Sequence, residues 1–130
     1  MRYLMQMYST ADEFGAAMAA YSPEDLSAMV TWMKDFDAEL RASGELVDDQ
    51  GLAGPETLTT VQARDGADPL VTTGPASPST PFLVGYWLID VADQARAVAL
   101  AARVSASPGA GARPNNIPVT LSQVAEAPPA

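Results

Sequence analysis

The feature that most constrains the fold is the run FLVGYWLIDV at positions 82–91, because it is apolar on both of its alternating faces. One face would carry Phe82, Val84, Tyr86 and Leu88, and the other would carry Leu83, Trp87, Ile89 and Val91. A strand with two apolar faces is usually central in its sheet and covered on both sides. The chain must therefore supply or recruit cover for both faces of that sheet.

The clearest helix signal begins at residue 22. Ser22 is a good N-cap, Pro23 suits the first helical position, and Asp25 stands where the acid of a capping box reaches back. Gly44 is a natural stop signal for the same helix. Between these signals the apolar residues follow helical spacing, and they are Leu26, Met29, Val30, Met33, Phe36 and Leu40.

The remaining predicted elements are short. Residues 9–21 are expected to form a loop or one or two helical turns, and Asp93 is expected to cap an alanine-rich helix that ends near Val104. Asp65-Gly66 marks the turn of a hairpin. The predicted strands are Tyr3–Tyr8, Leu58–Ala63, Pro69–Thr73, Phe82–Val91 and Val119–Val124.

This order, β-α-β-β-β-α-β, predicts an α+β fold with a four- or five-stranded antiparallel sheet. We expect residues 1–125 to form one domain and residues 126–130 to form a disordered tail. Two helices suffice to cover one face of such a sheet. The simplest cover for the other face is the same face of a second copy, so the sequence predicts a homodimer.

Several segments, in this order and spacing, resemble the YCII-related family, in the branch named for its DGPF motif. The matching pieces are the helix end with Phe36, Leu40 and Gly44, residues 51–66 (GLAGPETLTTVQARDG), Gly74-Pro75, and residues 85–91. The resemblance implies a ferredoxin-like antiparallel sheet with two helices on one face. It also implies that two such sheets pair as a dimeric α+β barrel.

The same resemblance implies ligand-binding residues in the signature loop, which in the family lies beside a cleft. The loop corresponds to Thr73, Gly74, Pro75 and Ser77, and Thr73-Gly74-Pro75-Ala76 stands where the family has Asp-Gly-Pro-Phe. Threonine exchanges hydrogen bonds but cannot act as a carboxylate base. Arg113 is the candidate to replace an arginine that the family often carries near the position of Ser122.

Composition narrows the chemistry. The chain has 130 residues, a net charge of −9 and only seven basic residues, which disfavours nucleic acid and anionic membranes as partners. It has no cysteine and no histidine and no phosphate-binding glycine loop, so we expect no metal and no cofactor. Asp48-Asp49 is interpreted as an isolated surface pair. Without a signal peptide or a long apolar run, a cytoplasmic location is expected.

Two aspartates are the candidates for acid–base catalysis. Asp37 falls inside the apolar face of the first helix, where desolvation would raise its pKa; alternatively, an ion pair with Arg41 one turn later would keep it ionised and inert. Asp90 ends the central strand and would lie at the mouth of a barrel interior. The alternative for Asp90 is a loop acid that helps Asp93 to cap the second helix.

Three aromatic residues complete the candidate site. Tyr8 and Tyr86 could share one sheet face as catalytic hydrogen-bond donors, and Trp87 is a candidate ligand-binding residue. The sequence thus predicts a small-molecule-binding homodimer with one mostly apolar pocket per subunit. Its favoured activity is cofactor-free acid–base chemistry, of isomerase, cyclase or lyase type, on an aromatic or polyketide-like metabolite. The alternatives are a non-catalytic ligand-binding or regulatory partner that lost the signature Asp, and a cofactor-independent oxygenase.

Overall fold

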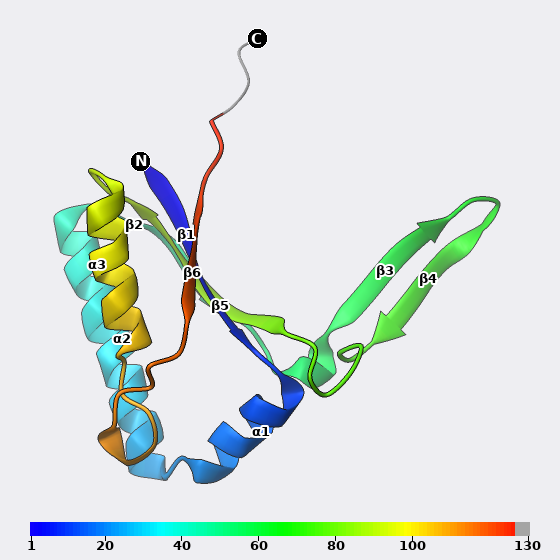
Figure 1. The fold of residues 1–130 in the computed structure, drawn as a ribbon, viewed down its shortest axis with the longest axis horizontal. Helices are drawn as coiled ribbons and strands as arrows, with labels where there is room; N and C mark the ends of the chain where they lie inside the picture. The colour runs from blue at the N-terminus through cyan, green and yellow to red at the C-terminus, as the bar shows by residue number, and fades with distance from the viewer. Residues whose placement is uncertain (127–130) are drawn as a thin grey trace.

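The computed structural model describes residues 1–126, so residues 127–130 of the predicted tail lie outside the described residues. Its main sheet has four strands: β1 (Arg2–Ser9), β2 (Leu46–Gly51), β5 (Phe82–Asp90) and β6 (Val119–Gln123). They lie in the order β2-β5-β1-β6, and every neighbouring pair is antiparallel (Figure 1). With one helical segment between β1 and β2 and another between β5 and β6, this is the βαββαβ order of a ferredoxin-like sheet. The predicted α+β class is confirmed.

Helices α2 (Pro23–Ser43) and α3 (Gln94–Ser105) lie side by side on one face of the sheet, as Figure 1 shows. Their ends are where the sequence places them. Ser22 and Asp25 form a reciprocal capping box, Gly44 ends α2 with a φ of 77°, and Asp93 accepts a hydrogen bond from the Arg96 amide at the start of α3. Within residues 1–126, none of the helices combines the length and the apolarity needed to cross a membrane.

The core lies between these helices and the sheet. The aromatic ring of Phe36 stacks on Trp32 at 4.9 Å between centroids and meets Trp87 edge-on at 5.8 Å. The Arg103 guanidinium covers the same ring at 5.0 Å, a cation–π contact. The most deeply buried large side chains come from all layers of the fold, and they are Met5, Phe36, Leu40, Ile89, Leu100 and Val104.

Two elements differ from the sequence prediction. Residues Ala11–Ala20 form a helix, α1, of ten residues, longer than the loop or one or two turns expected there; Thr10 caps it by accepting a hydrogen bond from the Glu13 amide. Strand β2 was not predicted at all. Its sequence, LVDDQG, is too acidic for a strand pattern, and it is an edge strand that pairs only with β5.

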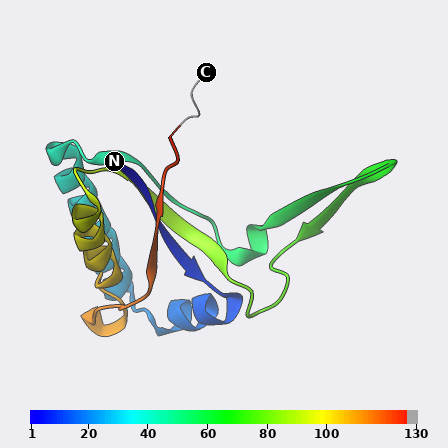
Figure 2. The same ribbon diagram turned by 45° about the horizontal axis from the view of Figure 1, so that its top comes forward.

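The predicted hairpin forms, but it does not join the main sheet. Strands β3 (Thr59–Arg64) and β4 (Ala67–Thr73) pair only with each other, and they project away from the body of the molecule (Figures 1 and 2). Every residue of both strands is exposed. The expected four- or five-stranded sheet is therefore a four-stranded sheet with β2 in place of the hairpin.

An ion pair joins α3 to the connection between α2 and β2, and we predict that it stabilises the fold. Arg96 of α3 donates two hydrogen bonds, at 2.9 and 2.8 Å, to the carboxylate of Glu45, whose side chain is 15% exposed. Chiefly through these bonds, Arg96 lowers the pKa of Glu45. Arg96→Met, which keeps the aliphatic stem, is expected to lower the free energy of unfolding at pH 7 by about 1–2 kcal/mol in urea titrations.

The pH dependence of this effect has a definite sign. The folded-state pKa of Glu45 is lowered, so its contribution is present at neutral pH and is lost as the pH falls through that pKa. The difference between wild type and Arg96→Met should therefore shrink in acid. Arg2→Met is the matched control, because its partner Asp90 lies 3.7 Å away and both side chains are about half exposed. An equal loss in the control would contradict the prediction.

Candidate functional site

The face of the main sheet opposite α2 and α3 carries a mixture of polar and aromatic side chains. Strand register aligns its residues in two rows that each cross all four strands. Its central row is Gln50, Tyr86, Gln6 and Thr120, and the next row is Asp48, Leu88, Leu4 and Ser122. All eight side chains are exposed or partly exposed, in contrast to the buried Trp87, Ile89, Tyr3 and Met5 that point to the helices. We call these two rows the uncovered face.

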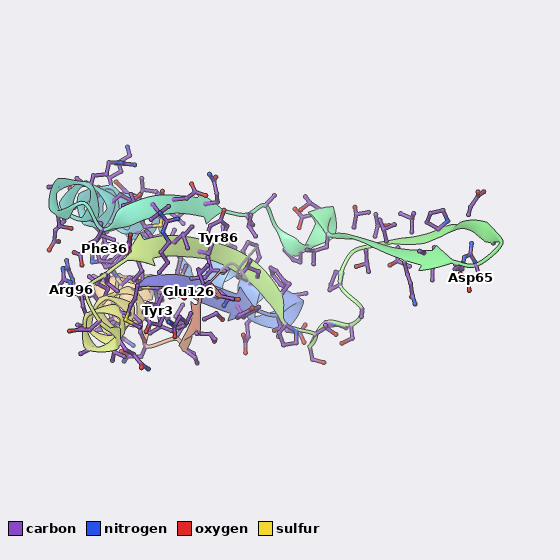
Figure 3. All side chains as sticks on the ribbon, turned by 90° about the horizontal axis from the view of Figure 1, so that it is seen from above. Tyr3, Phe36, Asp65, Tyr86, Arg96 and Glu126 are labelled. Atoms are coloured by element: carbon purple, nitrogen blue, oxygen red, sulfur yellow. The ribbon has the colours of Figure 1, made fainter. Side chains whose placement is uncertain are left out.

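A tyrosine–carboxylate pair lies in the middle of the uncovered face. The Tyr86 hydroxyl donates a hydrogen bond of 2.9 Å to the Asp48 carboxylate, which also accepts a longer bond of 3.4 Å from the Gln50 amide. Figure 3 shows Tyr86 on β5, in the body of the molecule and away from the projecting hairpin. The bond to Asp48 raises the pKa of Tyr86, because loss of the phenol proton would leave two negative charges in contact. The phenol is therefore protonated at neutral pH.

A second hydrogen-bonded chain lies beside the first. The Tyr8 hydroxyl donates to the Gln6 side-chain oxygen at 2.5 Å, and the Gln6 amide donates to the Ser122 hydroxyl at 2.6 Å. Gln6 is also the cross-strand neighbour of Tyr86. The two tyrosines thus reach the same face through neighbouring residues, although a bulge between Met7 and Tyr8 shifts the register at that end. This arrangement presents hydroxyl and amide groups on a flat, partly apolar surface.

Asp90, a predicted catalytic residue, lies at the far end of β5. Its carboxylate accepts a hydrogen bond of 3.2 Å from the N-terminal amine of Met1, and Arg2 lies 3.7 Å away. At about 3.3 Å per residue, four residues place Asp90 about 13 Å along the strand from Tyr86. Asp93 alone caps α3, so the capping alternative does not apply to Asp90 either. Asp90 functions as an ion-pair partner of the N-terminus in this fold.

Asp37 and Trp87 lie on the opposite, helix-covered face. The Trp87 indole N–H donates a hydrogen bond of 2.7 Å to Asp37, and the Trp87 side chain is only 4% exposed. Trp87 therefore belongs to the core and cannot contact a ligand together with Tyr86. The alternative partner predicted for Asp37, Arg41, forms no ion pair with it among the described residues, and the partly buried Asp37 faces the core through its bond to Trp87.

A second carboxyl group meets Asp37 from β2. A hydrogen bond with Asp37, together with partial burial and repulsion between the two groups, raises the pKa of Asp49 to about 6; nearby Arg41 opposes this rise. When two carboxyl groups share a hydrogen bond, ionising the second of them is disfavoured by the charge of the first. The interpretation of Asp48-Asp49 as an isolated surface pair is thus wrong, because the two side chains lie on opposite faces and each has a partner from β5 or α2.

A register shift in β2 explains this arrangement. Leu46 pairs with Ile89 and Asp48 with Leu88, so Val47 is an extra residue between them. Strict alternation from Leu46 would turn Asp48 toward the helices. The extra residue instead places Asp48 on the uncovered face and Asp49 against α2. The pairing with Tyr86 depends on this local irregularity, which explains why a period-2 pattern did not reveal it.

The loop that corresponds to the family signature lies at the opposite end of β5 from Asp90. Thr73 pairs with Thr59 at the base of the hairpin, and Gly74, with a φ of 79°, donates its amide to Leu58 at 2.8 Å. The Ser77 hydroxyl shares a hydrogen bond of 2.8 Å with Thr80. These contacts hold the turn and join it to the hairpin. They bring the predicted ligand-binding residues Thr73, Gly74, Pro75 and Ser77 next to none of the other predicted site residues.

Arg113 lies in a third region. Its carbonyl accepts the Gly109 amide at 2.7 Å, in the segment of η2 (Ala110–Ala112) that follows α3. That segment contacts α2 near its N-terminal end, where the backbone of Ser22 and, next, that of Gly111 lower the pKa of Asp25. The structure therefore separates the predicted residues. Tyr8 and Tyr86 lie on the uncovered face, Asp37 and Trp87 lie on the side of the helices, and Asp90, the signature loop and Arg113 lie at three separate peripheral places.

Two shallow, open depressions in the described part of the chain lie away from the uncovered face. One is on the outer side of α2, beside Trp32 and Asp35, and the other lies between α3 and β6, beside Val98 and Leu121. Neither contains a predicted site residue. The apolar pocket predicted for each subunit stays a prediction.

The fold and the site together define an α+β protein that has a ferredoxin-like sheet with one face covered by helices and one polar–aromatic face uncovered. No protein-family model matches this chain, and no curated protein sequence matches it significantly. The sheet order is compatible with the fold that the YCII resemblance implies. The family assignment itself stays a prediction.

Proposed function

We propose that this protein binds a small, flat, mostly uncharged molecule on the uncovered face and catalyses cofactor-free proton transfer on it. The observation that carries the proposal is the Tyr86–Asp48 hydrogen bond of 2.9 Å in the middle of that face. A carboxylate and a protonated phenol in contact form a base and a hydrogen-bond donor that act on adjacent atoms. The surrounding Leu4, Leu88 and Tyr8 suit an aromatic or polyketide-like ligand.

The proposed step needs no group from outside the chain. The Asp48 carboxylate removes a proton from a carbon next to a ligand carbonyl, and the electrons of the broken C–H bond move to the carbonyl oxygen. The Tyr86 phenol, released from Asp48 as that group becomes protonated, donates a hydrogen bond to the developing enolate oxygen. Return of the proton to a different atom gives an isomerisation, and loss of a leaving group gives a lyase reaction.

Asp48 takes the place that the sequence assigned to Asp37 or Asp90. Asp37 is on the other side of the sheet, and Asp90 is about 13 Å along the strand, so neither carboxylate reaches the Tyr86 hydroxyl. Asp48 does, because β2 and β5 pair in the observed register. We retain the predicted reaction class and change the carboxylate.

The proposal includes a homodimer. A single chain leaves Tyr86, Leu88 and Leu4 open to solvent, whereas catalysis by a carboxylate is stronger where water is excluded. A second copy that covers the same face would enclose a space between the two sheets. The ligand would then occupy a site to which both copies contribute.

Binding without catalysis is the second candidate. The observation that favours it is that Asp48 already accepts hydrogen bonds from Tyr86 and Gln50, so the carboxylate has its partners in the absence of a ligand. A satisfied pair of this kind also occurs as a purely structural feature. The same experiment distinguishes the two candidates, because only catalysis exchanges ligand protons.

We predict that Tyr86→Phe and Asp48→Asn each slow proton exchange of a bound ligand by about a hundredfold. Phenols and 1,3-dicarbonyl compounds are incubated with the protein in D2O, and binding and deuterium incorporation are both followed by NMR. Tyr21→Phe is the control for Tyr86→Phe, since Tyr21 bonds to Asn115 outside the site, and Asp35→Asn is the control for Asp48→Asn. Both controls should exchange at the wild-type rate.

The outcomes separate the alternatives. Exchange that persists in Tyr86→Phe and Asp48→Asn would refute the proposed site. Ligand binding without exchange in the wild type would favour the binding-only function. Oxygen consumption that depends on the ligand would instead support a cofactor-independent oxygenase.

A further inference from the structure

The projecting hairpin is the feature of the fold that the proposed function does not use. We call residues 59–73 the arm; it comprises β3, β4 and the Asp65-Gly66 turn between them (Figures 1 and 3). The arm extends from the end of the sheet, and its strands pair with no other strand of the described residues. A two-stranded hairpin on its own is marginally stable in water, so an arm of this kind needs a contact surface elsewhere.

The two faces of the arm differ in polarity. On one face Val61 lies opposite Val71, next to the uncharged pair Thr59 and Thr73. The other face carries Gln62 opposite Leu70, Thr60 opposite Thr72, and Arg64 near the turn. Alternation of this kind is typical of an antiparallel ribbon with one face packed and the other in water.

The apolar face also carries the most exposed large hydrophobic side chains of residues 1–126. Val61 is 62% exposed and Val71 is 58% exposed, which are the two highest values among the large hydrophobic side chains of the described residues. Because they are cross-strand neighbours, they form one continuous patch. The structure therefore leaves uncovered the face of the arm that its sequence pattern would bury.

We propose that this apolar face packs against a second copy of the chain, so that each copy extends its arm onto the other. The inference rests on the homodimer in the proposed function and adds the surface that would hold it together. In a dimer with two-fold symmetry, each arm contacts the same surface of the other copy, so the two arm contacts form together.

Charge favours a second copy over a basic partner. The chain has a net charge of −9, but the arm contains only one arginine and two aspartates, and its Val61–Val71 face contains none of them. In the two rows of the uncovered face, Asp48 is the one charged side chain, and it is hydrogen-bonded to Tyr86. Two acidic molecules approach each other best through their least charged surfaces, whereas a basic partner would be drawn to the acidic remainder.

The area of these surfaces agrees with a dimer held by both. From strand spacings of about 4.8 Å and rises of about 3.4 Å per residue, the whole sheet face opposite the helices, over strands that average seven residues, spans roughly 450 Å², and one face of the arm spans roughly 230 Å². A stable interface buries about 800 Å² per partner. The sheet alone falls short of this value, and the arm supplies most of the difference.

A matched pair of variants tests the role of the arm. Val71→Asp places a carboxylate on the apolar face, and Leu70→Asp places the same group on the next residue, which faces the other way. Sedimentation equilibrium of the whole chain should show a wild-type dimer. We expect Val71→Asp to raise the dimer dissociation constant at least tenfold and Leu70→Asp to raise it less than threefold.

An armless chain provides an independent test. Thr59 and Thr73 are cross-strand partners, so a two-residue turn can close the chain between them without disturbing the core. This variant should unfold cooperatively by circular dichroism and sediment as a monomer. A monomeric wild type at 100 µM, equal effects of Val71→Asp and Leu70→Asp, or an armless chain that dimerises like the wild type would each overturn the inference.

The readouts keep this inference separate from the proposed function. Dimerisation is measured without any ligand. A monomeric wild type would therefore overturn the role of the arm and would say nothing about ligand binding by Tyr86. Conversely, Tyr86→Phe removes only the hydroxyl and keeps the aromatic ring on the uncovered face, so it should slow proton exchange while it leaves the dimer dissociation constant within about threefold of the wild-type value.

Discussion

Phe36→Ala is expected to lower the free energy of unfolding by about 3–5 kcal/mol, the largest effect of any single substitution considered for this chain. The Phe36 side chain is 1% exposed and lies where α2, α3 and the sheet meet. Its ring contacts Trp32, Trp87 and the Arg103 guanidinium. Truncation would leave a cavity between two indole rings that cannot collapse without moving α2.

Urea unfolding followed by circular dichroism measures this effect without relying on the tryptophans next to the cavity. Phe14→Ala is the matched control, because Phe14 of α1 is only partly buried and contacts a single aromatic ring, that of Phe82. The control should lose roughly 1–2 kcal/mol. A loss below about 1 kcal/mol for Phe36→Ala would mean that the packing around this ring does not hold the layers together.

Asp49→Asn is expected to stabilise the protein above pH 6 and to have little effect near pH 4. The folded-state pKa of Asp49 is raised to about 6 by its bond with Asp37, whereas an unfolded aspartate titrates near 3.9. Below the lower value both states are protonated. As the pH rises through 6, the folded state must give up this proton, and the stability associated with the shared proton is lost.

The asparagine side chain keeps a hydrogen-bond donor for Asp37 at every pH, so the variant avoids that loss. After allowance for solvent screening of a partly exposed group, the gain at pH 7.5 is about 1 kcal/mol, or roughly 3–5 °C in Tm. Thermal unfolding at pH 4 and pH 7.5 measures it. Asp35→Asn, an exposed neighbour on α2, is the control and should show no such pH dependence.

Trp87 offers a direct readout of the same proton. Its indole bonds to Asp37, which contacts Asp49, so its fluorescence should change as Asp49 ionises. Trp32→Phe leaves Trp87 as the single tryptophan, because the chain contains two. A transition near pH 6 that disappears in the additional presence of Asp49→Asn would support the shared proton, and an unchanged transition would refute it.

Local signals predicted the covered half of the fold well. The capping box at Ser22, the stop at Gly44 and the cap at Asp93 each depend on residues within a few positions of one another, and the structure confirms them. The apolar run of β5 correctly indicated a central strand. What the sequence did not reveal was strand partnership, which depends on residues far apart in the chain.

The hairpin and β2 illustrate that limit. The hairpin was predicted with its turn at Asp65-Gly66. No local sequence pattern indicates whether such a hairpin joins a third strand, and in the structure its two strands pair only with each other. Strand β2 lacks apolar alternation because it lies at an edge, and pairing with β5 rather than its own composition makes it a strand.

The candidate site shows the same division. Alternation placed Tyr86 and Trp87 on opposite faces of β5, as the structure does. The carboxylates that bond to them come from 38 and 50 residues earlier, across a sheet register and a helix packing that no spacing rule specifies. Asp48 was therefore overlooked, and Asp37 was found without its partner.

The extra residue in β2 also determines where the chain can change length. Residue 47 already lies outside the regular ladder, so its removal would leave the pairing of Leu46 and of Asp48–Gly51 with β5 intact. Deletion of Asp48 would instead bring Val47 opposite Leu88 and leave Tyr86 without its carboxylate, and deletion of Asp49 would turn Gln50 toward the helices. Loss of one residue is therefore tolerated just before Asp48, whereas loss of Asp48 or of the residue after it changes what one face of the sheet presents.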